Sequence, residues 1–215
     1  MEEGHKKGTT TIGVVCKDAV ILAADKRASM GYLIANKEVE KTFKITDKIA
    51  LTIAGIAADG QKLAGYLQAE MELYRMNSGV EPSLTVASNL MSNILFGRAK
   101  TFIPYIVQLI LGGEDEDGKF ALYTQDPSGS NIKETKFHAT GSGSPMAFGV
   151  LEDSYKENMS IDQSVELAIK AMASALKRDM ATGEGVDVTI ISRDGFKRLE
   201  KEKIAGMLKV KSINT

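Results

Sequence analysis

The residues best suited to chemistry stand near the start of the chain, in the segment Gly8-Thr9-Thr10-Thr11-Ile12-Gly13. Cleavage of the Gly8–Thr9 bond would leave Thr9 with both a hydroxyl nucleophile and a free α-amino group. Such a residue carries its own general base, which is a recognised way to activate a weak hydroxyl. An α-amino group has an ordinary pKa of about 8, which suits a proton acceptor near neutral pH. The alternative is that this segment only begins a β-branched strand after a short leader.

The histidine and cysteine counts exclude several other kinds of site. The chain of 215 residues has two histidines, His5 and His138, and one cysteine, Cys16. Because His5 belongs to the leader, a Ser-His-Asp or Cys-His enzyme would depend on His138. A single cysteine cannot form an internal disulfide or a zinc site built on a cysteine pair, and we expect Cys16 to be a small buried residue in the first strand. If the protein is a hydrolase, its base is therefore expected to be an amine, with no metal and no cofactor.

The composition is that of an ordered globular protein. Hydrophobic residues make up 43% of the chain and charged residues 26%, so it can bury one sizeable core and needs no second domain. The formal net charge of −1 gives no reason to expect a nucleic-acid partner. The leader lacks an apolar core and no long apolar window follows, so we expect neither a secretory signal nor a membrane span. The expected location is cytoplasmic.

Hydrophobic periodicity predicts the secondary structure. Segments 9–16 and 19–24 are β-branched and apolar, and the two residues Lys17-Asp18 between them predict a tight hairpin. Ser144 is expected to cap a helix that has Pro145 in its first turn. Further strands are predicted at 49–54, 105–111, 120–125, 186–192 and 196–199, and helices at about 58–76, 84–96, 144–155 and 161–180, the first with Leu63, Tyr66, Leu67, Met71 and Tyr74 on its buried face.

The order of these elements predicts the fold class. Strands arrive as hairpins separated by helix pairs, which argues against a doubly wound parallel sheet. Two antiparallel sheets packed face to face, with helices on both outer sides, would bury all four amphipathic helices. We therefore expect an α+β fold with a single domain in residues 9–215, after a leader of residues 1–8.

Four other features could complete a site around Thr9. A buried Lys41 near the amine of Thr9 would favour the alkoxide and keep the amine neutral, and it would need a carboxylate such as Asp25 to stay charged. Gly55 follows a core strand and could point its N–H at a substrate carbonyl, while the turn 141–144 could bring a hydroxyl to the amine. The alternatives are surface charges, a simple strand end, and a flexible loop with a helix cap.

Two stretches that look like motifs are interpreted as structural. Residues 113–120 imitate a phosphate-binding loop, but Phe120 replaces the hydroxyl that would hold magnesium, four acidic residues would repel phosphate, and a strand follows. We expect a hairpin loop there. Ser174 and Lys177 match Ser-x-x-Lys inside a predicted helix, without the partner motifs of that enzyme class. The sequence thus shows no nucleotide site, and any dependence on ATP must come from a partner.

A set of short segments, in order from Gly8 to about Ser192, carries a family resemblance. They are TTTIG at 9–13, DKR at 25–27, Lys41, TIAG at 52–55, TGSGSP at 140–145, RD at 178–179 and GEGVD at 183–187. With this combination the chain resembles a catalytic β subunit of an archaeal proteasome. The resemblance implies the αββα sandwich of N-terminal-nucleophile hydrolases, which agrees with the predicted order of elements.

The resemblance also implies roles for individual residues. Thr9 would be the nucleophile and its amine the general base, once the chain has cut its own Gly8–Thr9 bond. Lys41 would supply the activating charge, Asp25 would orient Lys41, and the Gly55 N–H would line the oxyanion hole. The remaining residues implied are Ser142, Asp179, Thr182 and Gly143 as supports near the amine, and Ala28, Val39, Ile53 and Ala57 as walls of the substrate pocket.

The implied function is that of a threonine endopeptidase which degrades unfolded polypeptides. Its implied partners are other β subunits in a heptameric ring, rings of α subunits, and an ATP-dependent unfoldase. The apolar pocket walls predict cleavage after hydrophobic residues. Thr182 stands where the family usually has serine, so the hydroxyl is kept but an added methyl could crowd the site. The alternatives are a non-catalytic subunit of the same ring and a small-molecule amidase of the same fold.

Overall fold

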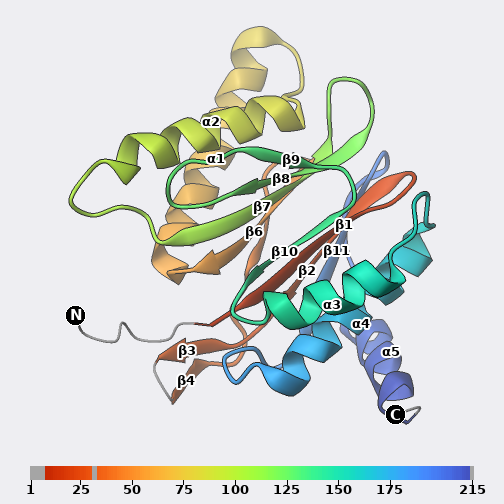
Figure 1. Cartoon of the computed structure of the whole chain (residues 1–215). Coiled ribbons are helices and arrows are strands. Elements are labelled where there is room, and N and C mark those ends of the chain that lie inside the picture. The colour runs from red at the N-terminus through yellow and green to blue at the C-terminus, as the bar shows by residue number, and fades with distance from the viewer. Residues whose placement is uncertain (1–7, 31–32, 214–215) are drawn as a thin grey trace.

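Two antiparallel sheets lie face to face at the centre of the molecule (Figure 1). The computed structural model describes residues 8–30 and 33–213, so residues 1–7 of the predicted leader lie outside the described residues. The first sheet has the order β10-β1-β2-β11-β12. Its strands are β1 (Thr10–Val15), β2 (Ala19–Asp25), β10 (Phe137–Gly141), β11 (Val186–Ser192) and β12 (Gly195–Arg198).

The second sheet has the order β5-β6-β7-β8-β9, and every neighbouring pair in it is antiparallel. A separate two-stranded ribbon follows β2 in the chain and consists of β3 (Ala28–Met30) and β4 (Leu33–Asn36). The strands of the second sheet are β5 (Thr42–Lys44), β6 (Ile49–Gly55), β7 (Val107–Glu114), β8 (Phe120–Gln125) and β9 (Ile132–Glu134).

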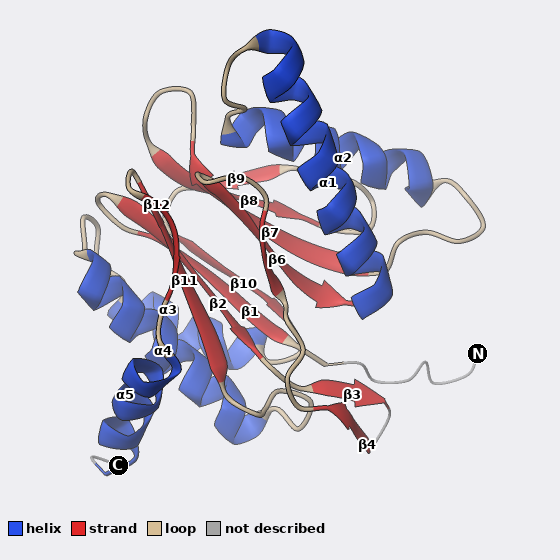
Figure 2. Cartoon of the chain, turned by 180° about the vertical axis from the view of Figure 1, so that it is seen from behind, coloured by secondary structure: helices blue, strands red, loops and turns tan. Residues whose placement is uncertain are grey.

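Helices cover the outer face of each sheet (Figure 2). One pair, α1 (Ala57–Ser78) and α2 (Leu84–Ala99), packs on the second sheet through one apolar cluster. The helices on the first sheet pack through another cluster; they are α3 (Ser144–Ser154), α4 (Ile161–Arg178) and α5 (Lys201–Ile213). The result is the four-layer αββα arrangement.

Strand alternation divides the core into three layers, because successive residues of a strand point to opposite faces. In β6, Leu51 and Ile53 belong to the cluster under α1 and α2, whereas Ala50 packs between the sheets. In β1, Ile12 lies under the helices of the first sheet, whereas Val15 packs between the sheets. The even and odd residues of each central strand therefore serve different layers.

Glycines allow the two sheets to approach closely. A Cβ on Gly13 of β1 would lie 2.8 Å from a methyl of Leu122, and one on Gly112 of β7 would lie 2.7 Å from Val20 Cγ1. Both separations are shorter than real carbon contacts, so side chains at these positions would force the sheets apart. This close contact brings residues of the two sheets within hydrogen-bonding range at one end of the sandwich.

The structure confirms the predicted fold class and most predicted elements. The hairpin turn at Lys17-Asp18 forms as predicted, Cys16 is buried, and 113–120 contains the loop between β7 and β8. Ser174 and Lys177 lie within α4. In the described part of the chain, no helix is long and apolar enough to cross a bilayer.

Three details of the prediction are wrong. Tyr66 and Tyr74 are 53% and 39% exposed, because α1 buries a narrower stripe that runs through Leu63, Leu67 and Met71. The cap of α3 is Gly143 rather than Ser144, which is the first helical residue. The short strands β3, β4, β5, β9 and β10 were not predicted, since three to five residues are too few to show a clear period.

Candidate active site

Several chain segments converge at one end of the two sheets. β1 begins there at Thr10, while β2, β6 and β10 end there at Asp25, Gly55 and Gly141. The register of the first sheet pairs Thr10 with Gly141, and α4 ends immediately before Asp179. The fold thus gathers residues that are distant in sequence around the start of β1: 25–29, 39–43, 53–57, 141–143 and 179–183.

Thr9 directly precedes β1 and is only 6% exposed. Its Oγ1 donates a hydrogen bond to the Gly8 carbonyl oxygen at 2.8 Å, so the hydroxyl lies against the bond that self-cleavage would break. The surroundings are tight: a Cβ on Gly8 would overlap Ala181, and one on Gly141, which has a φ of 89°, would overlap the Thr9 carbonyl. Glycine is therefore required both at position 8, directly before Thr9, and at position 141 of β10, which lies against the Thr9 carbonyl.

A buried ion pair is the second feature of this region. Lys41 Nζ lies 2.7 Å from Asp25 Oδ1, with Lys41 6% and Asp25 1% exposed. Asp25 also accepts backbone N–H bonds from Thr10 at 3.0 Å, Arg27 at 3.1 Å and Gly183 at 3.0 Å, which satisfy both carboxylate oxygens. Burial lowers the pKa of the Lys41 ammonium, and the charge of Asp25 opposes this only in part.

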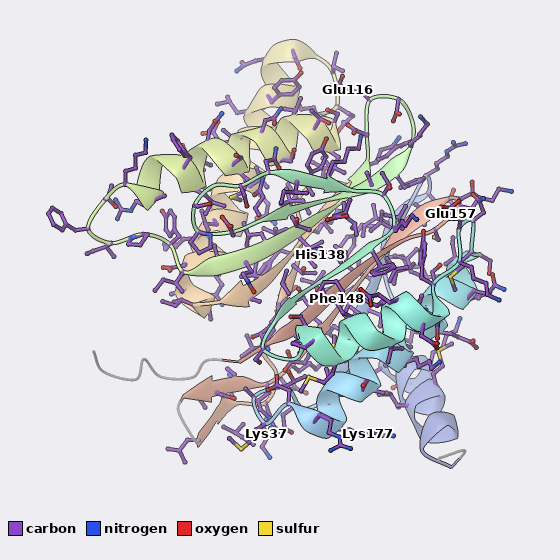
Figure 3. The ribbon with its side chains drawn as sticks, in the orientation of Figure 1. Lys37, Glu116, His138, Phe148, Glu157 and Lys177 are labelled. Carbon is purple, nitrogen blue, oxygen red and sulfur yellow. The ribbon has the colours of Figure 1, made fainter. Side chains whose placement is uncertain are left out.

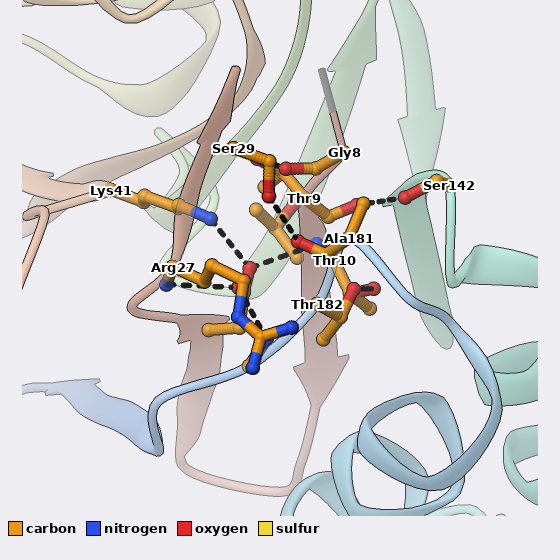
Figure 4. A network of polar contacts seen from close by, with 12 residues as sticks. Gly8, Thr9, Thr10, Arg27, Ser29, Lys41, Ser142, Ala181 and Thr182 are labelled. Atoms are coloured by element: carbon orange, nitrogen blue, oxygen red, sulfur yellow. Dashed lines mark hydrogen bonds and ion pairs between the residues drawn. The ribbon is translucent and has the colours of Figure 1, made fainter. Parts of the chain in front are cut away.

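Hydroxyl groups surround the carboxylate of Asp179, and two of the residues that carry them, Ser142 and Thr182, lie beside Thr9 and Thr10 in Figure 4. Its Oδ2 accepts from Ser142 Oγ at 2.6 Å and from Thr182 Oγ1 at 2.5 Å. Because Thr182 gives its proton to Asp179, the Thr10 hydroxyl donates to Thr182 across 2.6 Å. Ser142 Oγ also lies 3.4 Å from the Thr9 carbonyl oxygen. This chain of hydroxyls approaches Thr9 and Thr10 on the side away from Lys41.

Gly55 presents its N–H toward the same region. The Ile53 N–H donates to the Lys41 carbonyl at 3.0 Å, and strand alternation makes the Gly55 N–H point the same way. β5 begins at Thr42, which pairs with Thr52 of β6, so Gly55 lies beyond the end of β5. Its N–H therefore faces the space beside Lys41. Gly55 has a φ of 128°, and a Cβ on it would overlap the Ile106 carbonyl, so only glycine fits this position.

A pocket opens between these groups, and the four predicted wall residues Ala28, Val39, Ile53 and Ala57 all line it. Phe43 is an apolar wall that the sequence interpretation missed. Its signal was the i, i+2 spacing with Val39 and Lys41, which puts all three on one side of an extended segment. The remaining lining residues are Gly8, Thr9, Arg27, Ser29, Glu40, Lys41 and Gly55.

Arg27 is a further contributor that the sequence interpretation did not place in the site. Its guanidinium donates to the Met180 carbonyl at 2.9 Å and lies 3.3 Å from a Glu184 carboxylate oxygen. A Cβ on Gly183 would overlap this guanidinium. Arg27 therefore anchors the 180–184 loop, which supplies a hydrogen bond to Asp25.

The structure brings all the predicted site residues into this one region. Gly143 is required there because a Cβ on it would overlap the hydroxyl of Thr10. The Gly8–Thr9 bond is intact in the described chain, so the Thr9 nitrogen is an amide nitrogen in this geometry. In the described residues, no group of three or more His, Cys, Asp or Glu side chains is placed to hold a metal ion.

Comparison with known proteins shows the family to which the chain belongs. The family model described as "Proteasome subunit" matches residues 5–191. The chain belongs to the proteasome subunit family. Similar relatives are named "Proteasome subunit beta": the one from Methanothermobacter thermautotrophicus is 49% identical over 199 residues, which cover 92% of this chain and 93% of the relative. Those from Ferroglobus placidus and Methanosarcina mazei are 47% and 45% identical, over 94% and 93% of this chain and 95% and 94% of theirs.

These relatives place the chain among the proteasome β subunits. The matched region of this proteasome subunit contains the whole candidate site and stops within β11, before β12 and α5. Membership of the family also implies assembly with other proteasome subunits. The resemblance identified from the short segments is therefore confirmed at the level of the family.

Proposed function

We propose that this proteasome β subunit is a threonine endopeptidase with Thr9 as its nucleophile. The observation that carries the proposal is the convergence of three groups on one pocket: Thr9, the buried Lys41–Asp25 pair and the N–H of Gly55. Each group has a distinct use in acyl transfer, namely attack, charge stabilisation and oxyanion binding. An interior ion pair is a costly feature for a purely structural subunit.

The proposed reaction begins when the Thr9 nitrogen has become a free amine. Thr9 Oγ1 attacks the scissile carbonyl carbon, and its proton passes to the amine. The Gly55 N–H donates to the oxyanion of the tetrahedral intermediate. Collapse expels the leaving amine, which takes up the proton, and leaves an ester on Thr9. A water molecule then gives a proton to the Thr9 amine and attacks the ester. As the second tetrahedral intermediate collapses, that proton passes to Thr9 Oγ1 and the product acid is released.

Two groups of residues support the nucleophile in this proposal. The charge of Lys41, held by Asp25, favours the Thr9 alkoxide and keeps the amine in its neutral, basic form. Ser142 and Asp179 approach from the other side and orient the amine. Thr182 keeps the hydroxyl that binds Asp179, so its extra methyl does not remove the hydrogen bond.

Self-cleavage would produce the free amine. The Thr9 hydroxyl lies 2.8 Å from the Gly8 carbonyl oxygen, so it needs little movement to attack the carbonyl carbon. That attack transfers the acyl group from the Thr9 nitrogen to its oxygen, and water then hydrolyses the ester and releases residues 1–8. Activation would in this way depend on the same hydroxyl as catalysis.

The pocket walls support a preference for hydrophobic residues before the scissile bond. Apart from the hydroxyls of Thr9 and Ser29, its neutral side chains are apolar. Its three charged side chains already have partners, since Lys41 binds Asp25, Glu40 binds Arg198 and Arg27 binds Glu184. A charged substrate side chain would lose hydration without a free counter-ion. Peptides that differ only at the residue before the cleaved bond should be cut fastest when it is large and apolar, and equal rates for acidic and apolar residues would contradict this.

The decisive experiment compares the assembled wild-type protein with Thr9→Ala. We expect the intact mass of the wild type to show that residues 1–8 have been removed, and the wild type to cleave peptides. The variant should assemble but retain residues 1–8 and be inactive. Thr189→Val, which removes a buried hydroxyl in β11 away from the site, should behave as wild type. Peptidase activity in Thr9→Ala refutes the mechanism. A wild-type particle that retains its leader and is inactive supports the alternative of a non-catalytic subunit.

We further propose that the subunit works in the cytoplasm, within a heptameric β ring bounded by α-subunit rings and supplied with unfolded chains by an ATP-dependent unfoldase. The family membership supports assembly. Native mass spectrometry of the subunit purified with α subunits should give a mass in which the number of β subunits and the number of α subunits are each a multiple of seven. A folded monomer with full activity on simple amides would contradict the ring and favour the small-molecule amidase.

A further inference from the structure

The layer between the two sheets changes character from one end to the other. Away from the candidate site it is apolar, with Val15 and Val20 of the first sheet packed near Leu122 of the second. Toward the site, the positions on the same faces of β1 and β6 are Thr11 and Thr52, which are both fully buried. Polar groups therefore replace apolar ones where the two sheets carry the candidate catalytic groups.

These buried threonines form a hydrogen-bonded chain across the sheets. Thr52 Oγ1 of β6 donates to Thr11 Oγ1 of β1 at 3.1 Å, and Thr11 Oγ1 lies 2.7 Å from Thr140 Oγ1 of β10. A second bond spans the sheets nearby, where the Gly141 N–H donates to Gln108 Oε1 of β7 at 2.9 Å. Thus β10 is tied to the second sheet by one side chain and to β1 by another.

The position of the chain in the sequence gives it a consequence for catalysis. Thr11 is two residues after Thr9 on β1, and Thr52 is three residues before Gly55 on β6. The Thr52–Thr11 bond thus joins the strand of the proposed nucleophile to the strand of the proposed oxyanion donor. Apolar contacts are non-directional and tolerate sliding, whereas a hydrogen bond fixes both distance and angle.

We propose that Thr52 is a positioning residue, which fixes the distance between the Thr9 hydroxyl and the Gly55 N–H through its bond to Thr11. Gln108 is a second, more exposed member of the same cross-sheet linkage and acts on the Gly141–Ser142 turn. This inference rests on the proposed function, since it concerns the alignment of a nucleophile with an oxyanion donor. Small errors in that alignment reduce the rate of the chemical step more than they weaken binding.

The test separates the hydroxyl of Thr52 from its methyl group. Thr52→Val keeps the shape and loses the hydroxyl, while Thr11 and Thr140 retain each other. We expect Tm to change little and kcat to fall by about threefold to tenfold, the effect of one hydrogen bond, with KM nearly unchanged. Thr52→Ser keeps the hydroxyl and loses a buried methyl, so it should lower Tm while kcat stays close to wild type.

Thr189→Val is the matched control. Thr189 is also fully buried, and by strand alternation it lies on the same inter-sheet face as Ile191, but its hydroxyl has no hydrogen-bond partner among the described residues. It should keep both kcat and Tm, or gain Tm. If Thr52→Val has the kcat of Thr189→Val, or if kcat follows Tm across the three variants, the positioning role is refuted.

Amide hydrogen exchange of the assembled protein tests the linkage without relying on activity. Thr52→Val should increase exchange in segments 52–55 and 10–12, and Gln108→Met in segment 139–142, whereas Thr189→Val should change none of them. Unchanged exchange in all variants overturns the inference even if the enzyme is active. Thr9-independent activity, by contrast, refutes the proposed function and leaves the exchange measurement to decide on the linkage.

Discussion

Replacement of Lys41 by methionine tests the centre of the proposed mechanism. The substitution keeps the length and apolar stem of the side chain and removes the ammonium that lies 2.7 Å from Asp25 Oδ1. With an effective dielectric constant of about 20, two charges at that distance attract each other by about 6 kcal/mol. The desolvation of both groups offsets much of this attraction, so the cost of the substitution is set mainly by the carboxylate left behind.

The expected loss of stability follows from what still binds Asp25. Removal of one member of a buried pair typically costs about 3–5 kcal/mol. Asp25 keeps three backbone N–H donors after the substitution, so we expect about 3 kcal/mol. For a chain of this size that lowers Tm by about 6–12 °C. The peptidase kcat should fall much further, by about 10²–10⁴-fold, because the proposed nucleophile loses its activating charge.

Lys26→Met is the matched control for this experiment. Lys26 is 9% exposed and its Nζ lies 3.0 Å from Asp187 Oδ1, so it is also a buried lysine with a carboxylate partner. It does not line the pocket, and its loss should lower Tm while kcat stays within about threefold of wild type. The assay measures Tm and kcat for both variants of the assembled protein. Retention of kcat in Lys41→Met, or an equal loss in both variants, refutes the reasoning.

The pH dependence of the wild type gives a second measurement on Lys41. Burial lowers the pKa of Lys41 below its ordinary value of 10.5, so between the folded pKa and 10.5 the unfolded chain binds more protons. Over that window, the contribution of Lys41 to stability rises with pH. Lys41 loses its activating charge over the same pH window. We therefore expect kcat to fall below pH 10.5, although the deprotonation of Lys41 does not destabilise the fold there. A kcat that stays constant up to pH 10.5 would contradict a role for the charge.

Two further predictions follow from the geometry. Gly55→Ala places a Cβ against the Ile106 carbonyl at a φ of 128°, so the strand end must move and kcat should fall by about 10²–10³-fold; kinetics with unchanged kcat and KM would contradict the placement of its N–H. Burial lowers the pKa of His138, and the negative charge of Glu134 opposes that shift only in part. The His138 ring packs edge-on against Phe148 (Figure 3). The unfolded chain therefore takes up this proton first, and stability should fall as pH drops below about 6.5. His138→Gln should remove that part of the pH dependence in denaturant unfolding at pH 7.5 and 5.5, and an unchanged slope would show that other groups cause it.

Much of the fold could be predicted from the sequence because long segments have a clear period. The fourth helix, 161–180 by prediction and Ile161–Arg178 in the structure, shows an apolar stripe that only a helix can bury on one side. The hairpin at Lys17-Asp18 and the strand Val186–Ser192 were predicted for similar reasons. Short strands have no such signal of their own. β5, which begins directly after Lys41, forms through its pairing with β6.

The candidate chemistry was also visible in the sequence, in residue types rather than in distances. Gly8-Thr9, Asp25 and Lys41 could be considered together because a positive charge would help an amine-bearing threonine, and a buried lysine needs a carboxylate. That chemistry left surface charges open as the alternative, and it was the family resemblance that implied the roles of these residues. The sequence interpretation missed Phe43 as a pocket wall although its spacing from Lys41 was a signal, and nothing in the sequence could make Arg27 an anchor for the loop that follows Asp179.

The sequence by itself determined the longer helices and strands and indicated the reactive groups, since period and side-chain chemistry are local properties. Only the tertiary structure decided that Asp25 would be buried against Lys41, that the Gly55 N–H would point past the start of β5, and that Thr52 would reach Thr11. Each of these contacts joins residues that are distant in the chain. Their geometry depends on how two sheets twist and pack together, and no short stretch of sequence specifies that.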